Sequence, residues 1–465
     1  MEKNLESHNK IVGNSDAKVE IKSKSTSLYA AIWRWHFYAG IFLAPLILIL
    51  TISGVIYLFK PQIENAIYHD QLFVKEEKSV LTPEQLIVKV GKAYPSSVIT
   101  SYTPAPAKNL STQLEVDQNG EIKTVFINQY NGKILGDLKS EDRFVNKIVK
   151  IHGELMAGTI GDRIVEMTAS WAIILLVTGL YLWWPRKKEK IMGVLIPRFS
   201  KGKRMLLRDL HAVPAFWFSI FISIFIFTGL PWSGLLGNII NKFATATHTS
   251  YPTGLYDGNI PSSIIPSKDV TKVPWAAENL PVPTSNIMKA ASLKVSDMIS
   301  IADESNVHKG YTITLPANDN GVYTVSVNPP KPEDQATLHI DQYSGKILMD
   351  LRFKDYGMSA KIIEIGIALH EGHYFGVANQ LTDLIICLVL ASTTIFGIWI
   401  WWKRKPAGRI GSPLIPNDFK LTKGLIIIII LLGVILPLAG LSLIFVLIVD
   451  YLFIKRIPVL NKVFN

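Results

Sequence analysis

The stretch Ile367–His373 (IALHEGH) stands shortly before an uninterrupted hydrophobic run, Leu381–Trp402. A helix of that length is long enough to cross the ~30 Å hydrocarbon core of a lipid bilayer. The pattern therefore predicts that two histidines, His370 and His373, lie near one face of a membrane. The rest of the chain repeats this arrangement of a histidine beside an apolar run.

Three further apolar runs have the length of a transmembrane helix, and one histidine stands at or before the start of each. They are Phe37–Phe59 with His36, Ile164–Trp184 with His152, and Val213–Leu236 with His211. The chain of 465 residues is 49% hydrophobic, and the apolar excess lies in these runs. We therefore predict an α-helical integral membrane protein with a lipid bilayer around its spans.

The basic residues predict the topology. The formal net charge of +11 would suit a nucleic-acid partner, but the surplus is concentrated in two short loops. Pro185–Leu210 has nine Lys and Arg against two Asp and Glu, and Lys403–Gly424 has six against one. The positive-inside rule places both loops and the N-terminus in the cytoplasm and the two long polar regions outside. We expect no nucleic-acid partner. The single cysteine, Cys387, excludes a disulfide framework and a thiolate metal cluster.

An internal repeat sets the architecture. Thr124–Leu138 (TVFINQYNGKILGDL) recurs as Thr337–Leu351 (TLHIDQYSGKILMDL), and ten of the fifteen positions are identical. Alternating strands with turns such as Asn119-Gly120, and a helix capped by Thr82, predict an α+β domain in the first polar region. The second polar region repeats the pattern.

The repeat also relates the histidines in pairs. His152 aligns with His370 in the register that matches the Trp-Trp ends of the second and fourth spans. His36 aligns with His211 in the register that matches Ser53-Gly54 with Thr228-Gly229. Parallel copies imply a pseudo-two-fold axis along the membrane normal, which brings equivalent residues together. The sequence thus predicts one pair near the cytoplasmic face and the other near the outer face.

These patterns predict a four-helix core made of two parallel repeats, followed by a C-terminal hydrophobic segment. The segments are a cytoplasmic tail (1–27), a first transmembrane helix (28–59), an outer domain (60–142), the His152 helix with the second transmembrane helix (143–184), a basic loop (185–210), a third transmembrane helix (211–236), a second outer domain (237–356), the His370 helix with the fourth transmembrane helix (357–402), a basic loop (403–424) and the C-terminal segment (425–454). The last is too long for one span and short for two, and its basic flanks favour a short hairpin.

Paired histidines of this kind suit haem iron. Imidazole is neutral near pH 7 and is a good axial ligand for iron. Two imidazoles that face each other across a helical bundle would hold a six-coordinate haem. Two haems, one near each surface, would divide a ~30 Å membrane into shorter electron steps.

Other residues near the pairs have alternative interpretations. His373 lies one helical turn after His370, so it either replaces His370 as a ligand or binds substrate or a proton. Arg34 and Arg208 precede two of the histidines, and they either pair with haem propionates or simply follow the positive-inside rule. A zinc protease motif needs two histidines four residues apart, whereas the spacing here is three. The remaining histidines considered are predicted to have surface or packing roles: His69, His248, His308 and His339.

The chain resembles the bacterial PepSY-associated transmembrane family, from about Ser27 to Lys455. The resemblance rests on the two Gln-Tyr-Asn/Ser-Gly-Lys-Ile-Leu segments and on the four histidines of the two pairs. It implies an inner-membrane protein with two periplasmic PepSY domains. For the ferric-siderophore reductases of the family it also implies two b-type haems, which we place on His36, His211, His152 and His370.

The resemblance implies a di-haem oxidoreductase that passes electrons across the inner membrane to a ferric siderophore. No Gly-rich dinucleotide loop is found in the cytoplasmic segments, so a cytoplasmic flavoprotein or a membrane quinol would supply the electrons. Two alternatives remain. The outer domains are binding or regulatory modules on a membrane anchor, or the parallel repeats belong to a transporter. Against a transporter, the predicted spans hold almost no ionisable residues.

Overall fold

The computed structural model describes residues 16–184, 193–250, 262–285, 291–404 and 423–449, together with 452 and 456. The chain divides into two compact units. We call residues 1–52, 159–226 and 385–465 the helical unit, and residues 53–158 and 227–384 the sheet unit. The predicted tail 1–27 and the two predicted basic loops lie partly outside the described residues.

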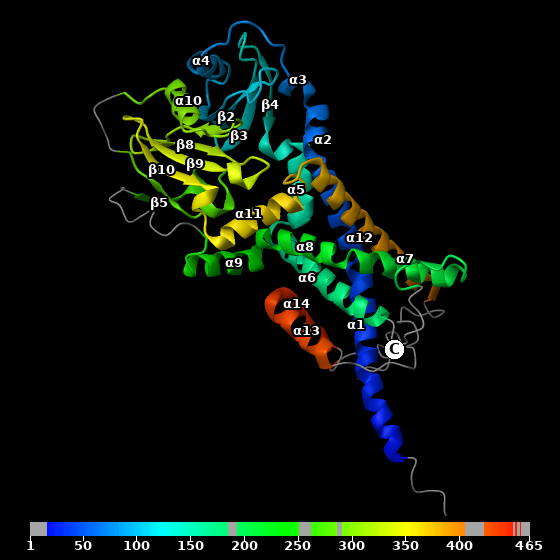
Figure 1. The fold of residues 1–465 in the computed structure, drawn as a ribbon. Helices are drawn as coiled ribbons and strands as arrows, with labels where there is room; N and C mark the ends of the chain where they lie inside the picture. Colours follow the sequence, from blue (N-terminus) through cyan, green and yellow to red (C-terminus); the bar gives the residue numbers. More distant parts are fainter. Residues whose placement is uncertain are drawn as a thin grey trace, which may run out of the picture. The chain divides into compact units, whose positions relative to one another are not determined.

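Helices of different lengths make up the helical unit (Figure 1). They are α1 (Asp16–Leu58), α6 (Gly158–Trp183), α7 (Lys203–Trp217), α8 (Ser219–Gly229), α12 (Val377–Arg404), α13 (Lys423–Ile435) and α14 (Pro437–Val449); α1, α6, α8 and α12 continue into the sheet unit. Three stretches are long and apolar enough to cross a membrane, namely Ile32–Leu58, Gly158–Trp183 and Val377–Arg404. The prediction of several membrane-spanning helices agrees with these helices.

The third apolar run differs from the prediction of one span over Val213–Leu236. It forms α7 and α8, which are bent by 63° at a short break around Phe218. Pro214 lies inside α7, one turn before the break. Proline lacks a backbone N–H and clashes with the carbonyl four residues earlier, so it weakens α7 on the N-terminal side of the break. The chain then makes a 3-10 turn at Leu230–Trp232 and continues as a separate helix, α9 (Gly234–Ala246).

The C-terminal apolar segment forms the two short helices α13 and α14, in the region for which the sequence predicts a hairpin. Gly433 and Gly440 lie backbone against backbone, where a side chain on either would meet the other helix. Trp171 of α6 donates a hydrogen bond from Nε1 to Ser442 Oγ at 2.7 Å, which ties the segment to the helical unit. Small residues at such contacts let apolar helices approach closely.

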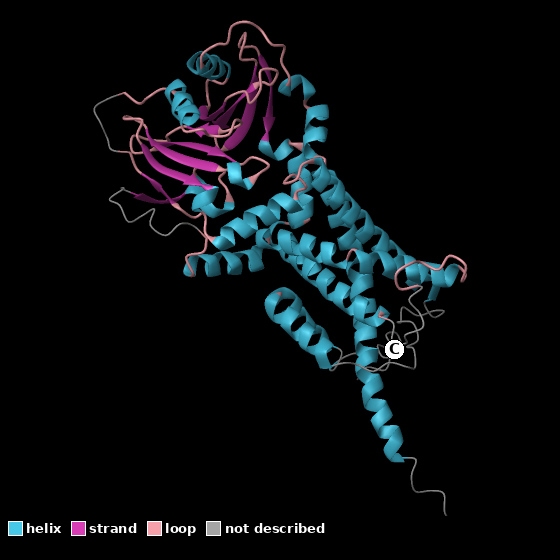
Figure 2. Cartoon of the chain, in the orientation of Figure 1, coloured by secondary structure: helices cyan, strands magenta, loops and turns pink. Residues whose placement is uncertain are grey.

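The sheet unit contains the strands, drawn in magenta in Figure 2. Eight of them form one antiparallel sheet in the order β10-β9-β8-β7-β1-β2-β3-β4. The strands are β1 (Val98–Thr103), β2 (Thr112–Gln118), β3 (Glu121–Ile127), β4 (Ile134–Lys139), β7 (Thr312–Thr314), β8 (Val322–Val327), β9 (Ala336–Asp341) and β10 (Ile347–Arg352). A separate two-stranded sheet pairs β5 (Ser262–Pro266) with β6 (Pro281–Pro283).

The sequence predicts two α+β domains, but their strands join into one sheet. β1 pairs with β7 through Ser101 opposite Thr314 and Tyr102 opposite Ile313. The helices α4 (Pro83–Ala93) and α10 (Val295–Glu304) contribute to one shared apolar core with both halves of the sheet. The two halves therefore hide each other's edge strand, which would otherwise be open to pairing with another chain.

The repeated segments form the same turn in both halves. Gly132 and Gly345 take left-handed conformations with φ of 70° and 71°, which favour glycine. The preceding glutamines, Gln129 and Gln342, donate from Nε2 to backbone carbonyls of a neighbouring loop. The repeat that is most visible in the sequence is thus a structural turn. The predicted capping box of Thr82 with Gln85 is also present.

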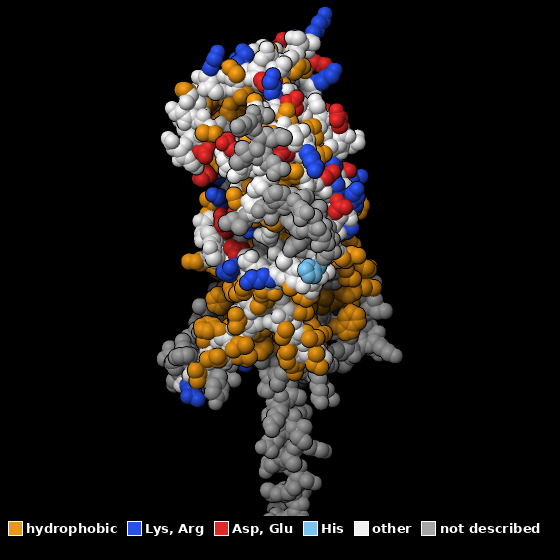
Figure 3. Space-filling view, turned by 90° about the vertical axis from the view of Figure 1, so that its left-hand side faces the viewer, with side chains coloured by type: hydrophobic (Ala, Val, Ile, Leu, Met, Phe, Trp, Pro, Cys, Tyr) orange, Lys and Arg blue, Asp and Glu red, His pale blue; other side chains and the backbone are white. Residues whose placement is uncertain are grey.

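Two helices of the sheet unit carry the histidines predicted to lie outside the spans. α5 (Phe144–Glu154) carries His152, and α11 (Met358–His370) ends at His370. The short helices α2 (Lys60–Ile67) and α3 (His69–Leu72) follow α1. In the view of Figure 3, hydrophobic side chains gather over the apolar helices, and acidic and basic side chains are interspersed over the sheet unit.

Candidate functional site: two histidine pairs

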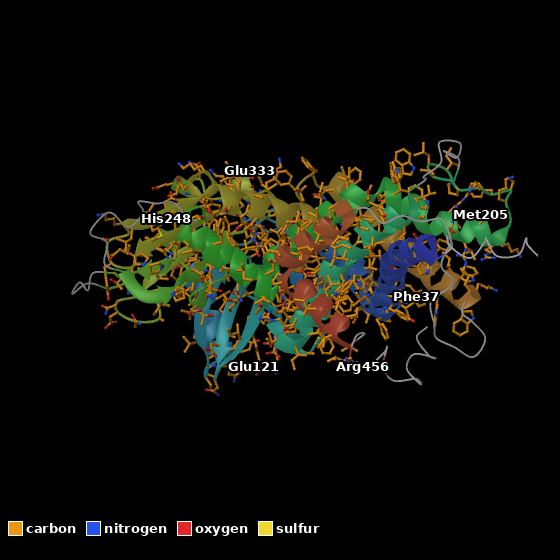
Figure 4. The ribbon with its side chains drawn as sticks, turned by 90° about the horizontal axis from the view of Figure 1, so that it is seen from below. Phe37, Glu121, Met205, His248, Glu333 and Arg456 are labelled. Carbon is orange, nitrogen blue, oxygen red and sulfur yellow. The ribbon has the colours of Figure 1, made fainter. Side chains whose placement is uncertain are left out.

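His36 lies on α1 in the helical unit, next to Phe37, which is labelled in Figure 4. Its Nδ1 lies 2.9 Å from Thr178 Oγ1 on α6. The Thr178 hydroxyl donates its own hydrogen to the carbonyl of Ile174 at 2.7 Å, so it accepts the hydrogen of His36 Nδ1. This assignment leaves the lone pair of His36 on Nε2, the nitrogen that would bind a metal.

His211 on α7 has the same arrangement within the helical unit. Its Nδ1 lies 2.8 Å from the carbonyl oxygen of Thr393 on α12. A carbonyl oxygen only accepts, so Nδ1 carries the hydrogen and Nε2 the lone pair. His36 and His211 lie close enough for a charge on His211 to act on His36. We call these two residues the first pair.

His152 and His370 face each other in the sheet unit, and we call them the second pair. Their ring centroids are 6.3 Å apart, with 61° between the ring planes. His152 Nδ1 lies 3.0 Å from Ser53 Oγ on α1, and His370 Nδ1 lies 3.4 Å from Thr228 Oγ1 on α8. A hydroxyl therefore stands beside Nδ1 of each ring.

Each of the four histidines packs against a glycine of a neighbouring helix. A Cβ added to Gly54 would lie 3.3 Å from His152 Cε1, and one added to Gly229 would lie 2.8 Å from His370 Cε1. In the first pair the corresponding distances are 3.0 Å for Gly179 to His36 and 3.2 Å for Gly397 to His211. The glycines are thus required by the close approach of the imidazoles.

The sequence analysis did not predict that these glycines contact the histidines, although the repeat contains a signal for it. The repeat aligns Ser53-Gly54 with Thr228-Gly229, and it aligns Gly179 with Gly397. Three of the four histidines contact a Ser-Gly or Thr-Gly dipeptide, in which the hydroxyl binds Nδ1 and the glycine makes room for the ring. The packing of the helices in the structure shows which dipeptide faces which histidine.

The second pair fits a metal held by two axial imidazoles. Metal–imidazole bonds are about 2 Å long, and two such bonds plus the half-widths of two rings give a centroid separation close to that observed. Within the described residues no group of three or more His, Cys, Asp and Glu is placed to hold a metal ion. Two imidazoles would leave the other coordination positions of an iron to a cofactor such as haem, so these residues fit that group.

His373 does not face the second pair. Its Nδ1 lies 2.8 Å from the carbonyl of Pro330, and its Nε2 lies 2.8 Å from Glu371 Oε2. Tyr57 donates a hydrogen bond to the other oxygen of Glu371 at 3.0 Å. Because a carbonyl and a carboxylate are both acceptors, both nitrogens of His373 must donate, which requires the imidazolium form. Of the two candidate ligands, His370 is therefore the one whose ring faces His152.

We expect His373 to titrate above the ordinary histidine range. Burial opposes protonation of this ring, but the hydrogen bond and charge of Glu371 outweigh it and raise the pKa of His373. A raised pKa contributes stability that is present at low pH and is lost as the pH rises through the raised value. NMR of ring-labelled histidine would measure the pKa directly.

Glu371→Gln supplies the control for His373. It removes the charge that raises the pKa and leaves the burial that lowers it, so the pKa of His373 should fall below its wild-type value. An unchanged titration in that variant would contradict the ion pair.

Arg208 contacts a buried carboxylate within the helical unit. Its guanidinium lies 3.3 Å from Asp209 Oδ1, and Asp209 is fully buried. Arg198 contacts both oxygens of the same carboxylate, at 2.7 and 2.8 Å. Arg34 is half-buried on α1 two residues before His36. Pairing of either arginine with a haem propionate stays a prediction.

Arg198→Ala is expected to destabilise the protein by about 3 kcal/mol, because it leaves the buried charge of Asp209 without its main partner. Thermal unfolding in detergent would measure the loss. Lys147→Ala, which breaks an exposed ion pair with Asp142, is the control and should cost at most about 1 kcal/mol. Equal effects of the two changes would contradict this account.

The other histidines considered have the packing and surface positions that the sequence predicts. His69, His248 and His308 are exposed, and His248 is labelled in Figure 4. His339 is fully buried on β9, where its Nδ1 lies 2.9 Å from Thr324 Oγ1. Burial lowers the pKa of His339 to about 4, so it is a neutral core residue.

The chain matches a known protein family. The family described as PepSY-associated TM region matches residues 33–404, which include both histidine pairs, His373, Arg34 and Arg208. No curated protein matches the chain.

Proposed function

Because the chain belongs to the family of PepSY-associated transmembrane regions, we propose that it is a di-haem membrane oxidoreductase. It would pass electrons across the bacterial inner membrane and reduce a ferric siderophore in the periplasm, so that iron is released. The observation that carries the proposal is the second pair, in which two imidazoles face each other at 6.3 Å between centroids.

In this proposal the first pair, His36 and His211, holds one b-type haem near the cytoplasmic face, and the second pair holds another near the periplasmic face. When bound, haem supplies iron that takes up and gives up one electron at a time. Two imidazole ligands on each iron would close it to oxygen and favour simple electron transfer.

The neighbouring residues prepare the imidazoles for this role. Thr178 and the carbonyl of Thr393 hold the hydrogen on Nδ1 in the first pair, so Nε2 is presented as the ligand. Ser53 and Thr228 stand at the same atom in the second pair. The glycines beside the rings fix how closely each histidine approaches the next helix.

The proposed substrate comes from the resemblance to ferric-siderophore reductases, and the chemistry of iron chelation supports it. Hard oxygen ligands hold Fe(III) far more tightly than Fe(II), so one electron delivered to the chelate weakens it. The sheet unit, with its eight-stranded sheet, would provide the surface on which the chelate docks. A cytoplasmic flavoprotein or a membrane quinol would supply the electron.

An absorption spectrum tests the proposal. We expect the detergent-purified protein to carry two haems per chain, with sharp low-spin bands after reduction by dithionite. Protein expressed with ample haem that shows no Soret band would overturn the proposal. That result would support the alternative, a membrane-anchored PepSY binding or regulatory module.

A further inference from the structure

Asp383 is a carboxyl group buried in an apolar helix. It lies on α12 within Val377–Arg404, a stretch apolar enough to cross a membrane, and its side chain is only 4% exposed. None of the ion pairs formed by the described residues involves Asp383. Ionisable residues inside membrane spans are costly and are typically functional, so this one needs an explanation.

Asn379 links Asp383 to the second pair. The Nδ2 group of Asn379 donates to Asp383 Oδ2 at 2.7 Å and to the carbonyl of Leu369 at 3.0 Å. Leu369 is the residue before His370 on α11. The carboxyl is therefore joined through one amide to the helix end that carries the proposed ligand.

The other end of the Asn379 amide has no partner. Its Oδ1 is buried without a hydrogen bond, and the side chain is 7% exposed. A buried acceptor is normally satisfied by protein or by an ordered water. The Asn379 oxygen is therefore an acceptor that is available to a hydrogen of a protonated carboxyl or of a water.

Burial makes the charge state of Asp383 sensitive to its surroundings. A carboxylate without a cationic partner is unfavourable in a low-dielectric interior, and a nearby positive charge is what would favour it. A haem held by the second pair would lose one unit of positive charge on taking up an electron. That loss would favour the acid form of Asp383 over the carboxylate.

We propose that Asp383 is a proton-exchange site coupled to electron transfer at the second pair, an inference that rests on the proposed function. If the second pair holds a haem, Asp383 would bind one proton from water when one electron from the donor reduces that haem. It would release the proton when the electron passes on to the ferric chelate, which becomes ferrous. Each cycle thus moves one electron with one compensating proton.

Other titratable groups face the same region of the sheet unit. Glu371 is already hydrogen-bonded by Tyr57 and His373, and Lys60 lies over the Tyr57 ring. Glu64 has a buried Oε1 without a partner and acts electrostatically on Tyr57. Glu64 is therefore the main competitor for the role given to Asp383, and it provides a matched control.

The test is a potentiometric titration of the haem-loaded full chain at several pH values. One proton bound per electron lowers the midpoint potential by about 59 mV per pH unit. We expect a pH-dependent potential for one of the two haems in the wild type and in Glu64→Gln. In Asp383→Asn that dependence should be lost. A slope that survives in Asp383→Asn, or disappears in Glu64→Gln, would overturn the proposal.

A second measurement needs no variant of Asp383. Infrared difference spectra of the wild type should show a protonated-carboxyl band that appears on reduction and shifts when the protein contains ¹³C-aspartate. Glu364 is the control, because it is another buried carboxyl of the sheet unit and burial raises its pKa. Glu364→Gln should leave the difference band unchanged. A difference spectrum without the aspartate band overturns the proposal even if Asp383→Asn does not fold.

The results distinguish failure of the proton-exchange site from failure of the proposed function. Two haems with potentials that do not change with pH would remove the proton-exchange site and leave the proposed function intact. A protein without haem would remove both.

Discussion

His370→Ala is expected to halve the haem content of the purified protein and to leave the remaining haem low-spin. The variant removes one of the two imidazoles of the second pair, and His152 alone cannot supply both axial ligands. The first pair lies in the helical unit on other residues, so its haem should remain. His152→Ala should give the same result.

His373→Ala is the matched control for His370→Ala. It removes a histidine only three positions away, but one whose two nitrogens are occupied by Pro330 and Glu371. We expect full haem content in this variant. If His373→Ala lost haem and His370→Ala kept it, the ligand assignment would be reversed.

The glycine contacts predict a graded series with an effect nearly as large. In Gly229→Ala the new Cβ would lie 2.8 Å from His370 Cε1, closer than real contacts allow, so the ring or the helix must move. We expect most of the haem at the second pair to be lost. In Gly54→Ala the distance to His152 is 3.3 Å, which a small shift relieves, so the loss should be much smaller.

Gly40→Ala is the control for this series. Gly40 lies on α1, like Gly54, and nothing stands within 4 Å of a Cβ at that position. Because alanine favours a helix by about 1 kcal/mol over glycine, this variant should keep its haem and its stability. The measurement is the haem content per chain of each of the three variants. Equal haem in Gly229→Ala and Gly40→Ala would show that the close approach does not matter.

The sequence carries much of the fold because its strongest signals are local. Apolar length predicts the spans, the Asn119-Gly120 turn predicts a hairpin, and Thr82 predicts a helix start. The bend between α7 and α8 was missed, although Pro214 is visible, because proline in a membrane helix is often tolerated. The merging of two domains into one sheet was missed because β1 and β7 have no local pairing signal.

The sequence likewise predicts some features of the candidate site and not others. The repeat predicts which histidines are equivalent, and the structure brings His152 and His370 together. The partners of Nδ1 come from other helices, so no spacing in the sequence identifies them. The expectation that the spans hold almost no ionisable residues also overlooked Asp383. One aspartate barely changes the composition of an apolar run, so the pattern does not single it out. Its burial in the structure is what marks it as a candidate functional residue.

The pairing of β1 with β7 in a single sheet has a consequence for how the protein folds during its synthesis. β1 is synthesised more than two hundred residues before β7, and two apolar runs are made in between. Until β7 arrives, the backbone groups along one side of β1 have no partner, and such an open edge invites aggregation. Pairing over so long a chain separation is also slow. We therefore expect the first half to be prone to aggregation while the second half is being translated.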